Sequence, residues 1–329
     1  MKDFNFKALW KNLLLIVEII LFIKIFSAIF GDINSLIGVT VITAILMFKD
    51  MNLEYEIKQS AFLIVILYTY MGLVTSLYNI NIILAFLINI VSIFFVIYLT
   101  SENLPYKAYI SFILLYVFME GNPTSGSKEF GIRLASVFIG GILVALTLYL
   151  SQRKLKINKK VKDAFNNLDI NGERFRFSIK MAVGLALAML VGRLIGTEKG
   201  MWISVTVMSL TQPTHKDVKE RIRKRFIGTI IGAIAFVIIF EIIVPEKYYI
   251  LITLVLSYIY TFIDEYFTKI IFITINALTA AMVLFDSRIS IALRVGFLCI
   301  GIVITYIISK LDTIIINRKE ALEEDSVTS

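Results

Sequence analysis

Long apolar runs recur along the whole chain, and charged residues gather in the short segments between them. Runs of about 18 or more apolar residues can cross a hydrocarbon core of roughly 30 Å. Within each run the apolar character continues on every side instead of alternating, which favours helices over barrel strands of about 10 residues. The pattern predicts twelve spans, at residues 13–30, 36–48, 60–77, 80–99, 108–119, 134–151, 177–196, 201–212, 226–244, 248–262, 270–285 and 290–309. We therefore expect an all-α integral membrane protein with about 12 transmembrane helices.

Composition narrows the class further. Of the 329 residues 58% are hydrophobic and 18% are charged, whereas a soluble domain averages roughly 45–50% and about 25%. The chain has one histidine and one cysteine, Cys299, which lies inside an apolar run. This argues against a disulfide scaffold and against a zinc site. We expect no metal and no cofactor, and we interpret the net charge of +8 as a sign of membrane topology, with no nucleic-acid partner.

The basic residues also orient the spans. Most of the 33 lysines and arginines fall in alternate connecting segments, above all in residues 152–175 and in the predicted loop 213–225. Lysine and arginine accumulate on the cytoplasmic side of membrane proteins. The sequence therefore predicts a multi-pass protein of the bacterial cytoplasmic (inner) membrane, with an even number of crossings and both termini in the cytoplasm.

Two stretches of the chain repeat one pattern. The segment VTVIT at 39–43 corresponds to VTVMS at 205–209, with one residue of slip relative to Gly31 and Gly196. Near the end of each half, an arginine precedes a glycine by seven residues, as Arg133 with Gly140 and as Arg294 with Gly301. Because six is an even number of spans, the two halves predict parallel six-helix repeats about an axis along the membrane normal. The expected divisions are the first repeat (1–151), a basic cytoplasmic linker (152–175), the second repeat (176–310) and a cytoplasmic tail (311–329).

The second half carries a longer pattern between about residues 175 and 235. A small-residue helix, MAVGLALAMLVGRLIG, is followed by Met201-Trp202-Ile203-Ser204-Val205, then by Gln212-Pro213 and by RFIGTIIGA from Arg225. This pattern resembles the fusaric acid resistance and aromatic acid exporter superfamily, and it is similar to the six-span unit of the plant aluminium-activated malate transporters. The resemblance implies export of organic anions, with aromatic carboxylic acids as the expected class. The first half lacks both the tryptophan and the R-x-x-G-T motif.

Charged and polar groups within the spans are candidates for a substrate path, because burying a charge in the bilayer is costly. Spans 36–48 and 201–212 are also too short to cross at 1.5 Å per residue, and such paired short segments point to a transporter's central site. The candidate path comprises Lys24, Thr40, Thr43, Arg133, Trp202, Thr206, Ser209, Arg225 and Arg294. Two alternatives stay open: Arg225 as a contact to lipid headgroups, and hydroxyls bonded to their own helix. Glu18, in the first span, is a possible proton-coupling group.

Small residues at intervals of four form two further patterns. In lipid, such stripes let helix backbones approach closely. We expect Gly184, Ala188, Gly192, Gly228 and Gly232 to pack against neighbouring helices.

The sequence thus predicts a transporter that exports organic anions through a path between two six-helix halves. No phosphate-binding loop of the G-x-x-x-x-G-K-[ST] type is present, so ATP hydrolysis by this chain is not expected. The expected partners are a small organic anion, the lipid bilayer, and an adaptor protein or further copies of the chain. The alternatives are a passive anion channel, an integral membrane enzyme, and an assembly subunit of an efflux complex. The enzyme and the assembly subunit are less favoured than the channel, and against the enzyme no compact acid/base cluster is evident.

Overall fold

The computed structural model describes residues 6–79, 81–166, 168–196, 200–282 and 287–328, and every regular element in these ranges is helical. The main helices of the first half are α1 (Phe6–Phe30), α2 (Ser35–Phe48), α3 (Ile57–Thr75), α4 (Ile82–Thr100), α5 (Tyr109–Glu120) and α6 (Ser127–Gln152). The linker contains one short helix, α7 (Asp163–Asn166). The second half comprises α8 (Glu173–Ile195), α9 (Met201–Leu210), α10 (His215–Phe236) with a π-helical extension η4 (Val237–Ile243), α11 (Tyr249–Tyr260), α12 (Tyr266–Met282) and α13 (Ser287–Thr328).

Each predicted span coincides with a helix, so the all-α membrane class is confirmed. Among the described residues, seven helices are long and apolar enough to cross a membrane, in place of the twelve crossings expected from the sequence. The helices α2, α5, α9 and α12 are apolar but shorter. The 10 residues of α9 extend only about 15 Å, which is half of a hydrocarbon core. Seven of the described helices thus meet the length of a complete crossing, and twelve crossings stay a prediction.

One predicted boundary is wrong. The predicted loop 213–225 is helical from His215, because the Thr214 side chain accepts a hydrogen bond from the Asp217 backbone N and caps α10; such caps stabilise a helix start. Helix α13 continues to Thr328 through the predicted tail 311–329, whose place in the cytoplasm stays a prediction. Residue 329 lies outside the described residues, as do residue 80 of the fourth predicted span and residues 283–285 of the eleventh.

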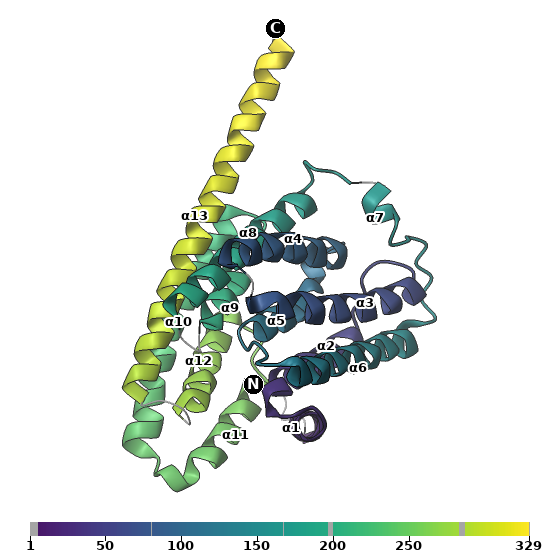
Figure 1. Ribbon diagram of the computed structural model, residues 1–329. Coiled ribbons are helices and arrows are strands. Elements are labelled where there is room, and N and C mark those ends of the chain that lie inside the picture. Colours follow the sequence, from purple (N-terminus) through teal and green to yellow (C-terminus); the bar gives the residue numbers. More distant parts are fainter. Residues whose placement is uncertain (1–5, 80, 167, 197–199, 283–286, 329) are drawn as a thin grey trace.

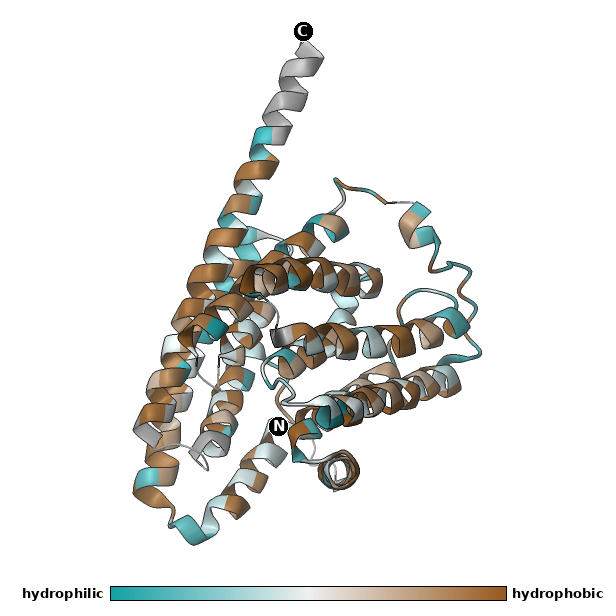
Figure 2. Cartoon of the chain, in the orientation of Figure 1, coloured by the Kyte–Doolittle hydropathy of each residue, from teal (hydrophilic) through white to brown (hydrophobic). Residues whose placement is uncertain are grey.

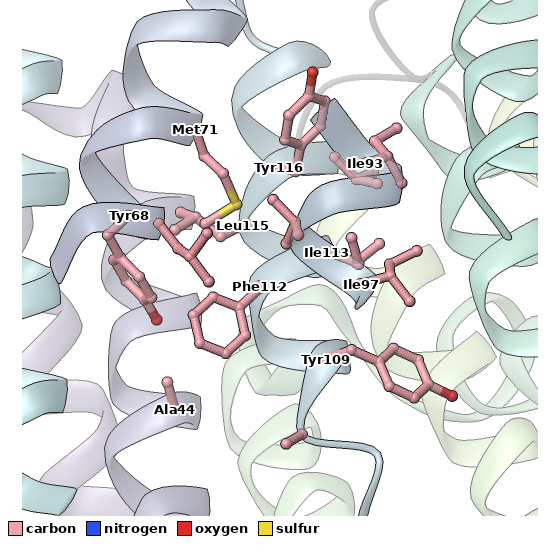
Figure 3. Close-up of a cluster of buried hydrophobic side chains, with 14 of the residues drawn as sticks. Ala44, Tyr68, Met71, Ile93, Ile97, Tyr109, Phe112, Ile113, Leu115 and Tyr116 are labelled. Atoms are coloured by element: carbon pink, nitrogen blue, oxygen red, sulfur yellow. The ribbon is translucent and has the colours of Figure 1, made fainter. Parts of the chain in front are cut away.

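Two apolar clusters hold the helices together. The larger one is centred on α5, where Phe112 packs edge-on against Tyr68 of α3 at 5.7 Å between ring centroids (Figure 3). The smaller one joins α10 and η4 to α12 through Phe236, Phe240 and Leu278. In Figure 1, α3, α4 and α6 lie across the view, whereas α10, α12 and α13 run along a different direction. Apolar residues predominate along most helices (Figure 2), and many large ones, such as Phe62, Ile83 and Ile250, are exposed, as a lipid environment requires.

Local features correspond between the halves. Gly31 ends α1 at φ 82° and Gly196 ends α8 at φ 68°, both left-handed conformations that favour glycine. A Cβ atom on Gly140 would lie 2.5 Å from Val41, and one on Gly301 would lie 2.6 Å from Thr206. Val41 therefore corresponds to Thr206, one residue away from the predicted alignment.

The packing of whole helices differs between the halves. The helix α3 packs most extensively on α6, whereas α10, its counterpart, packs more on α12 than on α13. Two matching six-helix repeats therefore stay a prediction.

The basic linker is anchored to the end of α4 by Glu102. Its carboxylate pairs with both Lys159 and Arg174, and the Arg174 guanidinium also lies 4.1 Å from the ring centre of Tyr98. Arg174 donates a further hydrogen bond of 2.8 Å to the Tyr55 hydroxyl. Through these contacts, the first turn of α8 is fixed to the first half of the chain.

Candidate anion-binding site

The site begins where α9 and α13 approach each other. Gly301 permits the contact, since a Cβ atom there would clash with the Thr206 side chain at 2.6 Å. Two helical turns earlier on α13, Arg294 places its guanidinium 3.9 Å from the ring centre of Trp202, near the start of α9. The Arg294 side chain is buried, with 9% of its surface exposed. A cation over an indole ring gains stability without a counter-charge, so this pair holds a positive charge inside the protein.

Arg225 is a second buried guanidinium in the same half of the chain. It lies on α10, is 4% exposed, and its buried Nε has no hydrogen-bond partner. The positive charge of Arg225 acts unfavourably on that of Arg294. Burying an arginine in the membrane costs at least about 2.5–3.5 kcal/mol, and repulsion by the Arg225 charge adds to this cost at Arg294. Such an arrangement is what a binding site for a negatively charged group requires.

Aromatic and basic side chains extend the site along α10. Arg221 donates a hydrogen bond of 3.0 Å to the Ser209 carbonyl at the end of α9. Its guanidinium lies 4.5 Å from the ring centre of Tyr266 on α12, and Tyr266 also adjoins Arg225. Burial and repulsion by Arg221 lower the pKa of Lys107, in the turn before α5. Within the described ranges, no carboxylate forms an ion pair with Arg221, Arg225 or Arg294.

Arg133, the counterpart of Arg294 in the first half, has a different environment. Its Nε donates to the Asn34 side chain at 3.2 Å, and its Nη1 donates to the backbone carbonyls of Met119 and Asn122. It therefore joins α6 to the end of α5 and to the start of α2. Because neutral oxygens already occupy these donors, Arg133 serves as a clamp between helices.

The four candidate hydroxyls all donate to carbonyls of their own helices. Thr40 bonds to Ile37 at 2.8 Å, and Thr43 to Val39 at 2.7 Å. In α9, Thr206 bonds to the Trp202 carbonyl at 2.9 Å and Ser209 to the Thr206 carbonyl at 3.0 Å. Thr40 is buried and Thr43 is exposed. An anion needs donors, and these hydroxyl protons are engaged elsewhere.

The charges of α1 lie away from the arginines. Lys24 is exposed on α1. Glu18 is 54% exposed and lies 3.9 Å from Lys49. The structure does not bring either residue together with Arg225 and Arg294.

The small residues stand at close helix contacts. A Cβ atom on Gly184 would meet Val207 of α9 at 3.1 Å, and one on Gly192 would meet the Gly200 carbonyl at 3.1 Å. On α10, a Cβ atom on Gly228 would meet Ile270 at 3.1 Å, and one on Gly232 would meet the Ile271 carbonyl of α12 at 2.7 Å. Ala188 is fully buried. The contacts of Gly228 and Gly232 position α10 against α12, and these two helices carry Arg225 and Tyr266.

Sequence reasoning missed Arg221 and Tyr266. Arg221 falls in a basic run that was interpreted as a loop, and nothing marks Tyr266 among the 15 tyrosines of the chain.

In the part of the chain that the structure describes, no group of three histidine, cysteine, aspartate or glutamate side chains is placed to hold a metal ion.

Comparison with known proteins places this site in a family context. Residues 187–308 match the family described as fusaric acid resistance protein-like. The matched segment contains Trp202, Arg221, Arg225, Tyr266 and Arg294. The predicted resemblance of the second half to the fusaric acid resistance superfamily is thereby confirmed. The similarity to plant malate transporters stays a prediction.

Two curated proteins show similarity over a third of the chain. One is "Uncharacterized protein ORF2" of Neisseria gonorrhoeae, 29% identical over 115 residues, which are 34% of this chain and 28% of that protein. The other is "Uncharacterized protein YhfK" of Escherichia coli K12, 29% identical over 111 residues, or 33% of this chain and 15% of that protein. The chain thus covers less than a third of either relative. No solved structure matches it.

The class of protein follows from these observations together. The family match and the apolar helices point to a multi-pass membrane transporter or exporter, and they favour a transport role over an enzymatic one.

Proposed function

We propose that the protein exports organic anions, aromatic carboxylates above all, and that the anion passes the arginines of α10 and α13. The observation that carries this proposal is the pair of buried guanidiniums, Arg294 over the Trp202 ring and Arg225 with an unpartnered Nε. A carboxylate would satisfy these donors and offset their repulsion. Trp202 and Tyr266 supply aromatic surface for the ring of such a substrate.

The family context supports the same class of substrate. Fusaric acid, after which the matching family is described, is itself an aromatic carboxylic acid. In the orientation that the basic residues predict, the inside-negative potential favours anion exit by about 2.3 kcal/mol per charge per 100 mV. The proposed path lies within α9, α10, α12 and α13, so it uses the second half more than the boundary between the halves.

The two corresponding arginines provide a matched test. The full-length protein and its Arg294→Gln and Arg133→Gln variants are reconstituted in vesicles loaded with phthalate, an aromatic dicarboxylate that crosses lipid slowly because it is charged. Efflux is then driven by a potassium diffusion potential. Arg294→Gln should lower the efflux per folded molecule at least ~10-fold, the equivalent of about 1.4 kcal/mol. Arg133→Gln should lower folded yield and leave the efflux per folded molecule unchanged.

Equal efflux by Arg294→Gln and the unchanged protein would refute the proposal. The rate at rising phthalate concentration also separates two mechanisms. Saturation would support a transporter with a binding site, whereas a linear increase would support the passive anion channel.

A further inference from the structure

One buried acidic residue takes no part in the proposed anion site. Among the described residues, five charged side chains are buried, namely Arg133, Lys180, Arg225, Arg294 and Glu120, and Glu120 is the only acid in that set. Glu120 ends α5 and is 7% exposed. A carboxylate buried in a membrane protein is costly, and it marks a functional group more often than a structural one.

The contacts of Glu120 leave its charge incompletely satisfied. Its Oε1 lies 3.5 Å from the Nε of Arg193 on α8, and this buried oxygen accepts no hydrogen bond. The pair joins the first half of the chain to the second. A proton on the carboxylate would remove the attraction, so the contact between α5 and α8 depends on whether Glu120 is protonated.

The other ionisable groups around Glu120 are few. Tyr116, one turn earlier on α5, donates its hydroxyl to Asn89 at 2.8 Å, and Tyr70 of α3 donates to Ser92 at 2.8 Å. Arg133 of α6 binds the carbonyls on either side of Glu120 and not its side chain. The neighbouring helices α2, α4 and α9 contain no charged residue. Arg193 is therefore the cation that faces this carboxylate.

The pair also adjoins the anion site. The residue after Glu120, Gly121, is so close to Met201 that a Cβ atom would lie 2.6 Å from that side chain. The Nδ2 of Asn122 lies 3.6 Å from the Met201 Sδ. The next residue after Met201 is Trp202, whose ring lies under the Arg294 guanidinium. Arg193 reaches the same point from α8, because the backbone of its neighbour Gly192 packs against Gly200.

From this arrangement we infer that Glu120 is the proton-binding carboxylate that couples anion export to proton entry, with Arg193 as the charge that it controls. The inference rests on the proposed export of anions. The Glu120 carboxylate takes a proton from the outer aqueous phase and becomes neutral. The positive charge of Arg193 then adds to that of Arg294 beside Trp202 and draws the anion outward. After the anion leaves, Glu120 releases the proton toward the cytoplasm and pairs with Arg193 again. One proton enters for each anion that leaves.

The test separates two driving forces in vesicles that contain the full-length protein and phthalate. In one arm a potassium diffusion potential is imposed without a pH difference. In the other arm the outside is made acidic while valinomycin and equal potassium hold the potential at zero. For the unchanged protein both arms should accelerate efflux. A difference of one pH unit should change the final ratio of outside to inside phthalate concentration roughly tenfold for each coupled proton. Glu120→Gln should abolish the response to pH and keep the response to potential.

The exposed Glu18 provides the control, and Glu18→Gln should respond in both arms. If Glu120→Gln folds poorly because Arg193 has lost its counter-charge, the Glu120→Gln, Arg193→Gln double variant restores neutrality and should show the same selective loss. Retention of the pH response by either Glu120 variant overturns the inference, as does an unchanged protein that responds to potential alone. An unchanged protein that moves no phthalate in either arm overturns the proposed export itself.

Discussion

The contact between α10 and α12 provides a sharp test of the packing, because one glycine leaves no space for a methyl group. A Cβ atom on Gly232 would lie 2.7 Å from the backbone oxygen of Ile271 and 2.8 Å from the Cβ of Thr274. An ordinary contact begins at about 3.4 Å, and neither neighbour is the end of a flexible side chain. Gly232→Ala must therefore push α12 away by several tenths of an ångström.

The cost of this change can be compared with a glycine in open surroundings. Nothing lies within 4 Å of a Cβ atom built on Gly296 of α13. Both substitutions gain about 0.4–1 kcal/mol because alanine restricts the unfolded chain, but only Gly232→Ala adds an overpacking cost of about 1–3 kcal/mol. Gly232→Ala should therefore be about 1–3 kcal/mol less stable than Gly296→Ala.

Thermal unfolding of the detergent-solubilised variants measures this difference. A loss of that size lowers Tm by roughly 1.5–4 °C for a chain of 329 residues. Displacement of α12 also moves Tyr266 away from Arg225, so phthalate efflux should fall with stability. Equal Tm values for Gly232→Ala and Gly296→Ala would refute the close approach of the two helices.

Two further predictions concern the linker. Glu102→Ala leaves Lys159 and Arg174 without their shared carboxylate. Because these side chains are only partly buried, the loss should destabilise the protein by about 1–2 kcal/mol, measured as a lower Tm. An unchanged Tm would show that the linker is not fixed there. After replacement of the native cysteine, Asn158→Cys and Ser125→Cys, both at exposed positions, should lie on opposite sides of the membrane. An impermeant thiol reagent added to intact cells should label Ser125→Cys alone, and labelling of Asn158→Cys would reverse the orientation.

The sequence by itself determined the class of the protein and the place of every main helix. A segment that spans the lipid needs an apolar surface, and this requirement produces runs of consecutive apolar residues that the sequence shows directly. The motif from Met201 to Gly232 likewise indicated the family, and the stripe of Gly228 and Gly232 indicated a packing face, because these patterns are local.

The tertiary structure decided which charges act together. Arg133 and Arg294 occupy corresponding positions in the sequence, yet the first binds neutral oxygens between helices while the second lies over Trp202 and is repelled by Arg225. Glu18 lies within an apolar run but is exposed, whereas Glu120 stands at the end of a run and is buried against Arg193. Whether a charge is paired, solvated or left for a ligand depends on neighbours far away in the chain, and only the packing of α5, α8, α9 and α13 brings those neighbours together.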